Sequence, residues 1–428
     1  MIDVKRLRQD PDGSRAALAR RLDAKVDAAV DRILALDQRR RALLVRTEAL
    51  KAQRNAQSDE VARRKKAGED AATLLAELKA SGDEVKQLDV QVREVDAALE
   101  GTLLEVPNIL QTDVPDGDAT QNRVVRSWGE PRHFDFTPKP HWELGAALGI
   151  LDLPAGAAVS GSGFPVFKGA GAKLLRALSS LMLDLHTSRH GYTEVSVPYL
   201  VNRASMQGTG QLPKFAEELY TITADELFLI PTAEVPVTNL HRDQILDAAA
   251  LPFGYTAWTP CFRREAGAAG KDTRGLIRVH QFDKVELVRF CRPEESEAQH
   301  ELLTGHAEAV LQALELPYRV LALAAGDTGF ASARTYDLEA WAGGVGAWLE
   351  VSSSSTFTDY QARRASIRFR PEPGAKPEFV HTLNASGVAF PRTLIALLEN
   401  NQESDGSVRI PASLVPYLGT DRLTPRGT

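Results

Sequence analysis

Two long runs near the N-terminus repeat apolar residues at heptad spacing, and they constrain the fold of this 428-residue chain more than any other feature. The first run, residues 28–66, contains no glycine or proline, and the second covers residues 73–103. Apolar residues that recur every three or four positions form one face of an α-helix. Because a short polar break at residues 67–70 separates the runs, the pattern predicts a long antiparallel helical hairpin. At 1.5 Å per residue, its first helix would be about 60 Å long.

The charge of this predicted hairpin is uneven. Residues 28–66 carry eleven Lys or Arg and five Asp or Glu, a balance of +6, whereas the whole chain has a net charge of -6. The seam also becomes polar toward the tip, at Arg54, Gln57 and Arg63. A polar seam contributes little stability, so a basic rod that contacts nucleic-acid phosphates would explain the length of the hairpin. A solvated coiled coil that merely carries charge explains the same pattern equally well.

The composition, with 43% apolar and 25% charged residues, is that of a soluble globular protein of two or three domains. The sequence has no run of about 18 apolar residues that would span a membrane, and its N-terminus lacks the apolar core of an export signal. Cys261 and Cys291 are the only cysteines, and neither lies in a CxxC or Cys/His metal motif. We therefore expect a protein of the reducing cytoplasm without a zinc site.

A segment rich in Pro, Gly and Asp divides the chain. It predicts a linker at residues 107–135 and a second domain at residues 136–428. Within this domain, Val159–Phe167 is predicted to be a strand with a turn, because its GSG sequence is more typical of a tight turn than of a phosphate loop. Lys173–His190 is predicted to be an amphipathic helix, and a strand that ends in proline follows at Tyr192–Pro198.

The stretch of residues 260–286 combines basic side chains with a loop of small residues. Arg263 and Arg264 precede that loop, residues 266–275, and Leu276–Glu286 then alternates like a strand. The pattern predicts two strands joined by a flexible polar loop, with Arg278 and Phe282 on one face of the second strand. Arg and Lys on such walls suit a polyanion such as a nucleotide phosphate chain. An ordinary hairpin with a solvated charged tip fits the spacing as well.

Several motifs of the chain resemble those of class II aminoacyl-tRNA synthetases, and in detail those of the seryl-tRNA synthetases. The sequence FRREAGAAGKDTRGLIRVHQFDKVE, residues 262–286, is similar to the second signature motif of the class. The helix and proline-ended strand at residues 173–198 resemble the first motif, and residues 381–400 resemble the third. Residues 229–234 match the TxE element of the family. The resemblance reaches from the predicted hairpin to about Leu418, so it covers nearly the whole chain.

The resemblance implies an α+β protein with two parts. Residues 1–106 would be a coiled-coil arm that binds tRNA, and residues 136–428 would be a class II catalytic domain on a mainly antiparallel sheet flanked by helices. A cytoplasmic homodimer, formed through the first motif, would activate serine with ATP and charge tRNA(Ser), and also tRNA(Sec) where the organism has one. The arm would grip the tRNA outside the anticodon through Arg39, Arg40, Arg46, Arg54, Arg63 and Arg64.

The ATP site of the family carries over to matching positions in this sequence. Arg263 would bridge the α-phosphate and the serine carboxylate, and Arg278 and Arg392 would hold the γ-phosphate side. Phe282 would stack on adenine, with Glu265 at the adenine amino group. The complete implied ATP-binding set is Arg263, Arg264, Glu265, Arg278, Val279, Phe282, Glu350, Val351, Ser352, Ser353 and Arg392.

The resemblance also implies a metal site and an amino-acid site. Glu350 and Ser353 would hold Mg²⁺, since hard oxygen ligands suit this ion, and Arg263, Glu350 and Arg392 would be the catalytic residues. A pocket that hydrogen-bonds the serine hydroxyl would reject alanine by about 10⁴–10⁵-fold, because alanine leaves its polar groups unpaired. Threonine would be excluded by its methyl group. The implied serine-binding set is Thr232, Ala233, Glu234, Arg263, Glu286, Asn384 and Ser386.

The chain departs from the family pattern at three places. Residues 352–356 read SSSST where the family often has SSCSN, and Ala385 and Pro391 stand where glycine is common. Every charged position is retained, so the departures concern fine serine geometry rather than the reaction class. Two alternatives remain. A synthetase-like enzyme that loads a carrier protein would not need the basic hairpin, and a non-catalytic paralogue would have lost the charges of the pocket.

Overall fold

The computed structural model describes residues 1–267 and 274–425, so most of the loop predicted at residues 266–275 lies outside the described residues. The chain divides into two compact units. We call residues 2–19 and 23–107 the helical unit, and residues 1, 20–22 and 108–428 the sheet unit.

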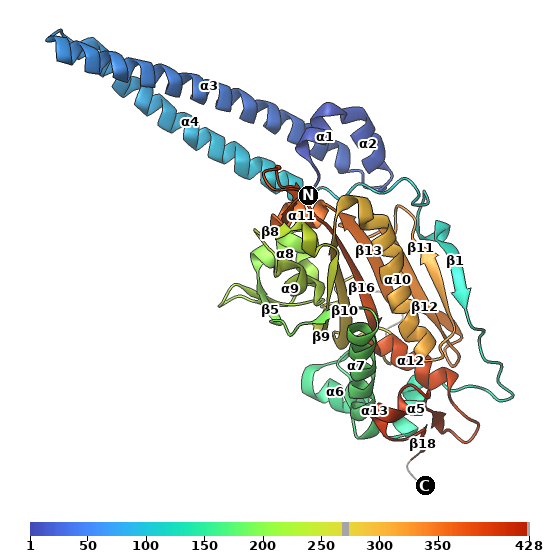
Figure 1. Ribbon diagram of the computed structural model, residues 1–428. Helices are drawn as coiled ribbons and strands as arrows, with labels where there is room; N and C mark the ends of the chain where they lie inside the picture. The colour runs from blue at the N-terminus through green and yellow to red at the C-terminus, as the bar shows by residue number, and fades with distance from the viewer. Residues whose placement is uncertain (268–273, 426–428) are drawn as a thin grey trace. The chain divides into compact units, whose positions relative to one another are not determined.

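Four helices make up the helical unit (Figure 1): α1 (Val4–Gln9), α2 (Pro11–Ala19), α3 (Val26–Ala67) and α4 (Ala72–Leu104). The long helices α3 and α4 pack along each other, which confirms the hairpin that the heptad runs predict. Gly68 ends α3 with a φ of 75°, a left-handed conformation that glycine adopts without strain. The buried apolar seam includes Val30, Ile33, Val85, Leu88, Val95 and Leu99.

The outer half of the hairpin is held largely by polar contacts. Arg54 and Gln57 are half-buried in the seam, as predicted. The prediction for Arg63 is wrong, because its side chain is 66% exposed and pairs with Glu60 of the same helix. Val61 is the buried residue of that turn, since it lies four positions after Gln57 on the same helical face. Contacts between the two helices here link Arg46 with Glu84, Lys51 with Asp89, and Gln57 with Glu77.

An eight-stranded sheet forms the centre of the sheet unit, with the strand order β1-β11-β12-β13-β16-β10-β9-β4. Neighbouring strands are antiparallel, except for the parallel pair β4 and β9. This mainly antiparallel sheet confirms the predicted α+β architecture. The strands are β1 (Arg123–Trp128), β4 (Thr193–Glu194), β9 (Phe253–Phe262), β10 (Gln281–Cys291), β11 (Tyr318–Ala322), β12 (Arg334–Ala342), β13 (Ala347–Thr358) and β16 (His381–Ala389).

Three helices, α7 (Ala170–Ser188), α10 (Ser296–Ala313) and α12 (Phe390–Asn400), cover one face of this sheet (Figure 1). Their residues Leu178, Val310 and Leu394 share one buried apolar cluster with Val285 of β10 and Leu338 of β12. We call this side of the sheet the helical face. Because side chains alternate along a strand, the neighbours of Val285 along β10, Lys284 and Glu286, point to the opposite face.

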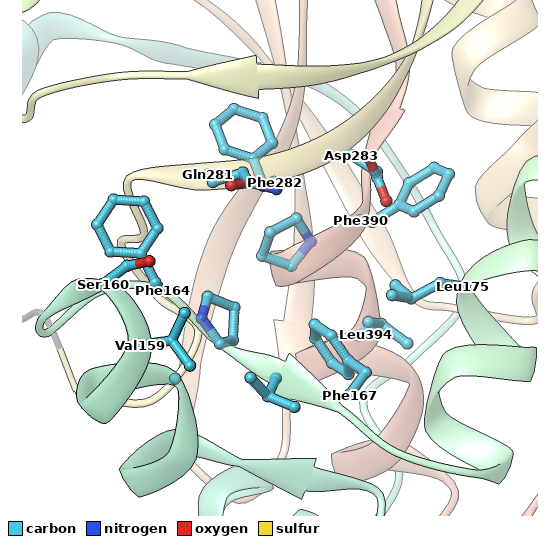
Figure 2. A pocket seen from close by; sticks show the side chains of 14 residues that line it. Val159, Ser160, Phe164, Phe167, Leu175, Gln281, Phe282, Asp283, Phe390 and Leu394 are labelled. Atoms are coloured by element: carbon cyan, nitrogen blue, oxygen red, sulfur yellow. The ribbon is translucent and has the colours of Figure 1, made fainter. Parts of the chain in front are cut away.

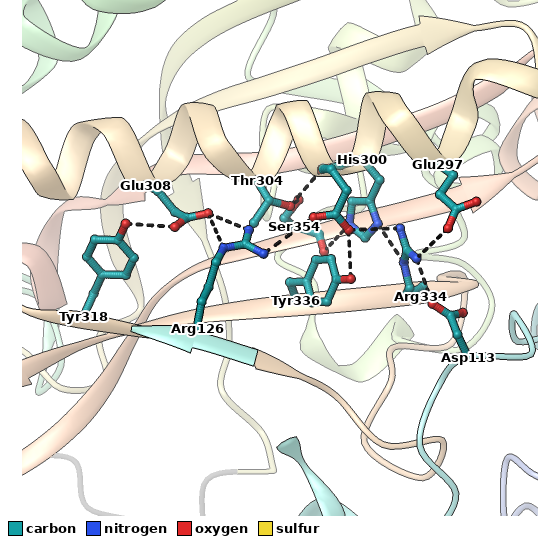
Figure 3. A network of polar contacts seen from close by, with 11 residues as sticks. Asp113, Arg126, Glu297, His300, Thr304, Glu308, Tyr318, Arg334, Tyr336 and Ser354 are labelled. Atoms are coloured by element: carbon teal, nitrogen blue, oxygen red, sulfur yellow. Dashed lines mark hydrogen bonds and ion pairs between the residues drawn. The ribbon is translucent and has the colours of Figure 1, made fainter. Parts of the chain in front are cut away.

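A polar network also joins α10 to the strands on the helical face (Figure 3). Arg334 Nε donates to His300 Nδ1 at 3.1 Å, and His300 Nε2 contacts the Ser354 carbonyl at 3.0 Å. Since an arginine can only donate, the His300 proton must lie on Nε2, which then donates to the carbonyl. Burial, with Arg334 beside the ring, lowers the pKa of His300 to about 3, so this histidine is neutral at pH 7.

Shorter elements complete the sheet unit. The helices are α5 (His141–Ala147), α6 (Leu153–Ser160), α8 (Arg203–Thr209), α9 (Glu234–Asn239), α11 (Tyr360–Ala365) and α13 (Val415–Leu418). The strands are β2 (Leu151–Asp152), β3 (Val166–Phe167), β5 (Leu200–Asn202), β6 (Thr221–Ile222), β7 (Leu227–Leu229), β8 (Ile245–Asp247), β14 (Arg368–Arg370), β15 (Glu378–Phe379), β17 (Val408–Arg409) and β18 (Arg422–Leu423). Within the described ranges, no helix combines the length and the apolar character that a membrane crossing needs.

The structure differs from the sequence prediction in four segments. The predicted linker contains β1, and the strand predicted at Tyr192–Pro198 is reduced to the two residues of β4. Val159 and Ser160 end α6 instead of beginning a strand, because the Asp152 side chain caps this helix at Ala155 and a proline fits its first turn. The second strand of the 260–286 stretch begins at Gln281 rather than Leu276. The backbone N–H of His280 donates to the Gly163 carbonyl and so lies outside the ladder.

Candidate active site

Two cavities flank the start of β10, and Phe282 borders both. The larger cavity, of about 290 Å³, lies on the helical face, and Figure 2 shows its apolar wall of Phe167, Leu175, Phe390 and Leu394. The smaller cavity, of about 200 Å³, gathers the charged side chains Arg263, Glu265, Arg278, Lys284, Glu350 and Arg392. Phosphate chemistry needs such charges, so the smaller cavity is the candidate active site.

The active-site cavity brings together most of the residues predicted to bind ATP. Those that line it are Arg263, Glu265, Arg278, Val279, Phe282, Glu350, Val351, Ser352 and Arg392. Arg264 is placed elsewhere, because its exposed side chain donates from Nη1 to the Glu217 carbonyl at 3.2 Å. Ser353 does not line the cavity but lies on the adjoining part of β13.

Two arginines of the cavity are oriented by neighbouring side chains and by a backbone carbonyl. The Arg263 guanidinium lies 5.2 Å from the centre of the Phe282 ring, and its Nε donates to the Pro231 carbonyl at 3.3 Å. Arg278 forms an ion pair with Glu265. Phe282, Lys284 and Glu286 alternate along β10 and so share the face opposite the helices.

A β-bulge in β13 aims Glu350 and Ser353 to the same side. Glu350 pairs with Glu339 of β12 and Ser353 pairs with Asp337, so three steps along β13 match two steps along β12. Residues three apart in a regular strand point to opposite faces, and the extra residue of the bulge brings these two back to one face. Arg392 Nη1 donates to the Glu350 backbone carbonyl at 2.9 Å and to its carboxylate at 3.2 Å.

Asp337 is a member of this group that the sequence did not reveal. Its Oδ1 is buried and has no hydrogen-bond partner among the described residues. Burial, and next the charge of Glu350, raise the pKa of Asp337 well above its ordinary value, while the Ser353 hydroxyl opposes the shift. A bound cation beside Glu350 would favour the ionised carboxylate. Across the described ranges, no three His, Cys, Asp or Glu side chains are arranged to hold a metal.

Buried charges occupy the other end of the active-site region. Glu286 is fully buried and forms an ion pair with Lys284, which the sequence prediction missed. The Glu286 carboxylate also accepts hydrogen bonds from Thr232 Oγ1 at 3.1 Å and Asn384 Nδ2 at 2.9 Å. Lys284 Nζ donates to Thr232 Oγ1 at 3.0 Å. Ser386 pairs with Glu286 in register, so four of the residues predicted to bind serine lie within this network or beside it.

Glu234 is a second buried carboxyl near Glu286. Gln361 of α11 donates from Nε2 to its Oε1 at 2.6 Å. Burial, and next the charge of Glu286, raise the pKa of Glu234 to about 7. Ala233, the residue before it, is fully buried and precedes the first turn of α9. A cationic group that entered this region would favour the ionised form of Glu234.

The fold and the cavity define a class II aminoacyl-tRNA synthetase. The family model described as the tRNA synthetase class II core domain (G, H, P, S and T) matches residues 219–401. The model described as the seryl-tRNA synthetase N-terminal domain matches residues 1–110.

Relatives that match this chain over nearly its whole length identify a family within this class. The chain is 59% identical over 420 residues to the serine–tRNA ligase of Gemmatimonas aurantiaca, covering 98% of this chain and 99% of the relative. It is 53% identical to that of Listeria monocytogenes serotype 4a, covering 98% of each.

The structure of seryl-tRNA synthetase from Pyrococcus horikoshii complexed with ATP has a TM-score of 0.94 and 38% identity, covering 100% of both chains. The cytoplasmic serine–tRNA ligase from Naegleria fowleri in complex with AMP has a TM-score of 0.88 and 29% identity, covering 100% of this chain and 99% of that one. The chain belongs to the seryl-tRNA synthetase family.

Proposed function

We propose that this chain activates L-serine with ATP and then charges tRNA(Ser), with tRNA(Sec) as a further substrate where it exists. In the first step the serine carboxylate attacks the α-phosphorus and pyrophosphate leaves. In the second, a ribose hydroxyl at the tRNA 3′ end attacks the carbonyl carbon of the adenylate and AMP leaves. One observation carries the proposal. Three arginines line one cavity, and Lys284, which pairs with the buried Glu286, lines the same cavity.

The three arginines support the phosphate half of the proposal. Arg263 lies at the border between the Phe282 ring and the buried network, where it can bridge the α-phosphate and the serine carboxylate. Arg278 and Arg392 would hold the γ-phosphate side, and the Phe282 ring would stack on adenine. Fixed guanidinium groups that meet developing phosphate charge in a partly dehydrated site supply catalysis by positioning and charge neutralisation. The named relative from Pyrococcus horikoshii was solved with ATP.

Glu350 and Ser353 are the residues proposed to hold Mg²⁺. The bulge brings both to one face, and the buried Asp337 Oδ1 beside them, which accepts no hydrogen bond from the described residues, suits a nearby cation. Mg²⁺ commonly takes one or two protein carboxylates together with phosphate oxygens. When bound, the ion would neutralise charge on the phosphates, while Arg392 fixes the Glu350 carboxylate that holds it.

The buried network supports serine as the amino acid. Thr232, Glu234 and Glu286 would surround the ammonium group, with Asn384 and Ser386 toward the side chain. A serine hydroxyl can exchange hydrogen bonds with the donors and acceptors of this network, whereas the methyl group of alanine would displace water from them without replacing its hydrogen bonds. Because Glu286, Asn384 and Ser386 lie on the paired central strands β10 and β16, the pocket can also exclude the extra methyl of threonine.

The helical unit is proposed to bind the tRNA through α3. This helix carries eleven Lys or Arg against six Asp or Glu, whereas α4 carries three against seven. Of the predicted contacts, Arg40 and Arg46 already pair with acids of α4, and Arg63 and Arg64 pair with Glu60. Arg39 is exposed, and neither it nor Arg54 has an ion-pair partner within the described part of the chain.

We further propose a cytoplasmic homodimer that forms along the edge of the sheet. The outermost strand, β4, has one free edge, and an unpaired edge is a template for another chain. Large apolar side chains are exposed near this edge, among them Tyr199, Leu200 and Trp258. A two-fold interface that joins equivalent surfaces would cover them. Sedimentation analysis should give a dimer, and Trp258→Lys should shift it toward the monomer.

Amino-acid-dependent ATP–pyrophosphate exchange with serine, threonine, alanine and glycine tests the proposed reaction. Charging of total tRNA follows with the same preparation. We expect exchange with serine and charging of a tRNA fraction. Exchange without charging would support an enzyme that loads a carrier protein. A preparation with no exchange for any of the four amino acids would overturn the catalytic assignment and favour a binding paralogue.

A further inference from the structure

His141, at the start of α5, lies far from the ATP motifs in sequence but contacts the backbone that carries one of them. Its Nε2 lies 2.9 Å from the backbone nitrogen of Leu276, and its Nδ1 lies 2.8 Å from Glu399 Oε1. Both side chains are fully buried. A backbone N–H can only donate, so Nε2 must accept and Nδ1 must carry the proton that is donated to Glu399. The ring is therefore fixed in one tautomer and one orientation.

Both carboxylate oxygens of Glu399 accept hydrogen bonds. Its Oε1 accepts from the His141 backbone N–H as well as the ring, and its Oε2 accepts from the backbone N–H groups of Gly344 and Val345, each at 2.8 Å. Four donors on two oxygens stabilise a buried carboxylate and leave it no freedom to rotate. Glu399 thus anchors His141 to α12 and to the turn between β12 and β13.

The same helix reaches the same segment at a second point. Arg392, in the first turn of α12, donates from Nε to the carbonyl of Ile277 at 3.1 Å. Arg392 and Glu399 are seven residues apart, which places them on one face of the helix, two turns from each other. The short segment of Leu276 and Ile277 is therefore tied to α12 twice, directly at its carbonyl and through His141 at its N–H.

We propose that His141, braced by Glu399, is a positioning residue for ATP, because it sets the path of the backbone that leads into Arg278. The inference rests on the proposed function, in which Arg278 contacts the γ-phosphate side. Gly275 supports it independently. This residue has a φ of 66°, and a Cβ built on it would lie 2.1 Å from His141 Nε2, so the close approach of chain and ring excludes any larger residue. His141 touches no substrate in this scheme and acts only through the segment it holds.

A pair of substitutions separates the two hydrogen bonds of the ring. His141→Asn keeps a donor near the Nδ1 position but loses the acceptor for Leu276. His141→Gln can place an amide oxygen near the Nε2 position and restore it. We expect His141→Asn to raise KM for ATP in pyrophosphate exchange by about tenfold, equivalent to about 1.4 kcal/mol, with KM for serine changed less than twofold. His141→Gln should stay within about threefold of the parent, and the exposed His133→Asn serves as a matched control.

Hydrogen exchange of the peptide that contains Leu276 gives a readout independent of activity. Its amide should exchange faster in His141→Asn than in the parent or in His141→Gln. The proposal is overturned if His141→Asn leaves KM for ATP and this exchange unchanged, or if it lowers Tm and the active fraction while both KM values stay constant. Should the histidine variants fail to fold, Gly275→Ala must give the same selective rise in KM for ATP. Absence of exchange activity in the parent enzyme would instead refute the proposed function, while the amide measurement would still test the contact.

Discussion

Charged residues of α3 and charged residues of the active site occupy different surroundings. The Arg46 side chain is 66% exposed where it pairs with Glu84, whereas Lys284 and Glu286 are 6% and 0% exposed. An exposed pair is screened by salt and stabilises by about 0–1 kcal/mol. A buried pair has given up its hydration, so each partner depends on the other.

This difference indicates how each region can use its charges. The basic helix can contact a long polyanion through many weak and replaceable interactions, so the loss of one changes little. The active site depends on every member of a small network, because one missing partner leaves an unpaired charge in a dehydrated space. The following substitutions test that contrast, beginning with the largest expected effect.

Breaking the buried pair should have the greatest consequence. Lys284→Met leaves the Glu286 carboxylate without its cation, and we expect the free energy of unfolding of the sheet unit to fall by about 3–5 kcal/mol. The matched surface change Arg46→Met should lower the stability of the helical unit by no more than about 1 kcal/mol. Urea unfolding at pH 7 measures both. Equal losses from the two variants would remove the basis of the comparison.

Within the second motif, adjacent arginines offer a sharper contrast. Arg263→Ala removes a guanidinium from the cavity and should lower kcat/KM for pyrophosphate exchange by about 10²–10³-fold. Arg264→Ala removes one that donates to the Glu217 carbonyl outside the cavity, and its effect should be threefold or less. Steady-state exchange kinetics decide between them. A comparable loss for Arg264→Ala would support the sequence prediction that this residue also binds ATP.

The buried carboxyl of Glu234 should make serine binding depend on pH. Its pKa is raised to about 7, so the group is increasingly protonated as pH falls through that value. If the ionised form pairs with the serine ammonium, KM for serine should rise by up to about tenfold per pH unit below 7 and level off above it. Exchange kinetics between pH 6 and 8.5 provide the measurement, and Glu234→Gln should remove the dependence. A parent profile that is flat across this range would contradict the role of Glu234.

The smallest effect is expected on the arm. Arg39→Ala should raise KM for tRNA by about two- to fourfold and reduce the salt dependence of tRNA binding by about one counterion. Serine-dependent exchange without tRNA should not change, because the helical unit contributes no residue to the active-site cavity. Charging assays at several salt concentrations measure the first effect. A loss of exchange without tRNA would argue against this division of roles.

Much of the fold could be read from periodicity, because the hairpin depends on local repeats. The heptad positions Val30 and Ile33 are buried as expected, and the helix predicted at Lys173–His190 is present with nearly the same bounds. The predictions are wrong where contacts between residues distant in the sequence determine the local structure. Residues 276–280 alternate like a strand, yet the backbone of His280 pairs with Gly163 and that of Leu276 with His141, more than a hundred residues earlier.

The candidate site divides in the same way. Residues such as Arg263 and Arg392 could be predicted because they stand in recognisable motifs. Lys284, Asp337 and Gln361 could not, since the role of each depends on contacts and burial that only the packing of several elements creates. A lysine between two acids in a strand predicts a solvated charge, and only the packing of β10 against β9 and β16 shows that Lys284 is buried.

The bulge in β13 changes which residues of that strand face the site. Counting outward from the turn at residues 343–346, every second side chain would face the site if the strand were regular, and Glu350 and Ser353 could never do so together. The single extra residue between them reverses the direction in which the following side chains point, while the order of the residues stays the same. Insertions can therefore be absorbed in the turn, whereas a deletion of one residue between positions 350 and 353 would leave the flanking sequence unchanged and still turn either Glu350 or Ser353 away from the site.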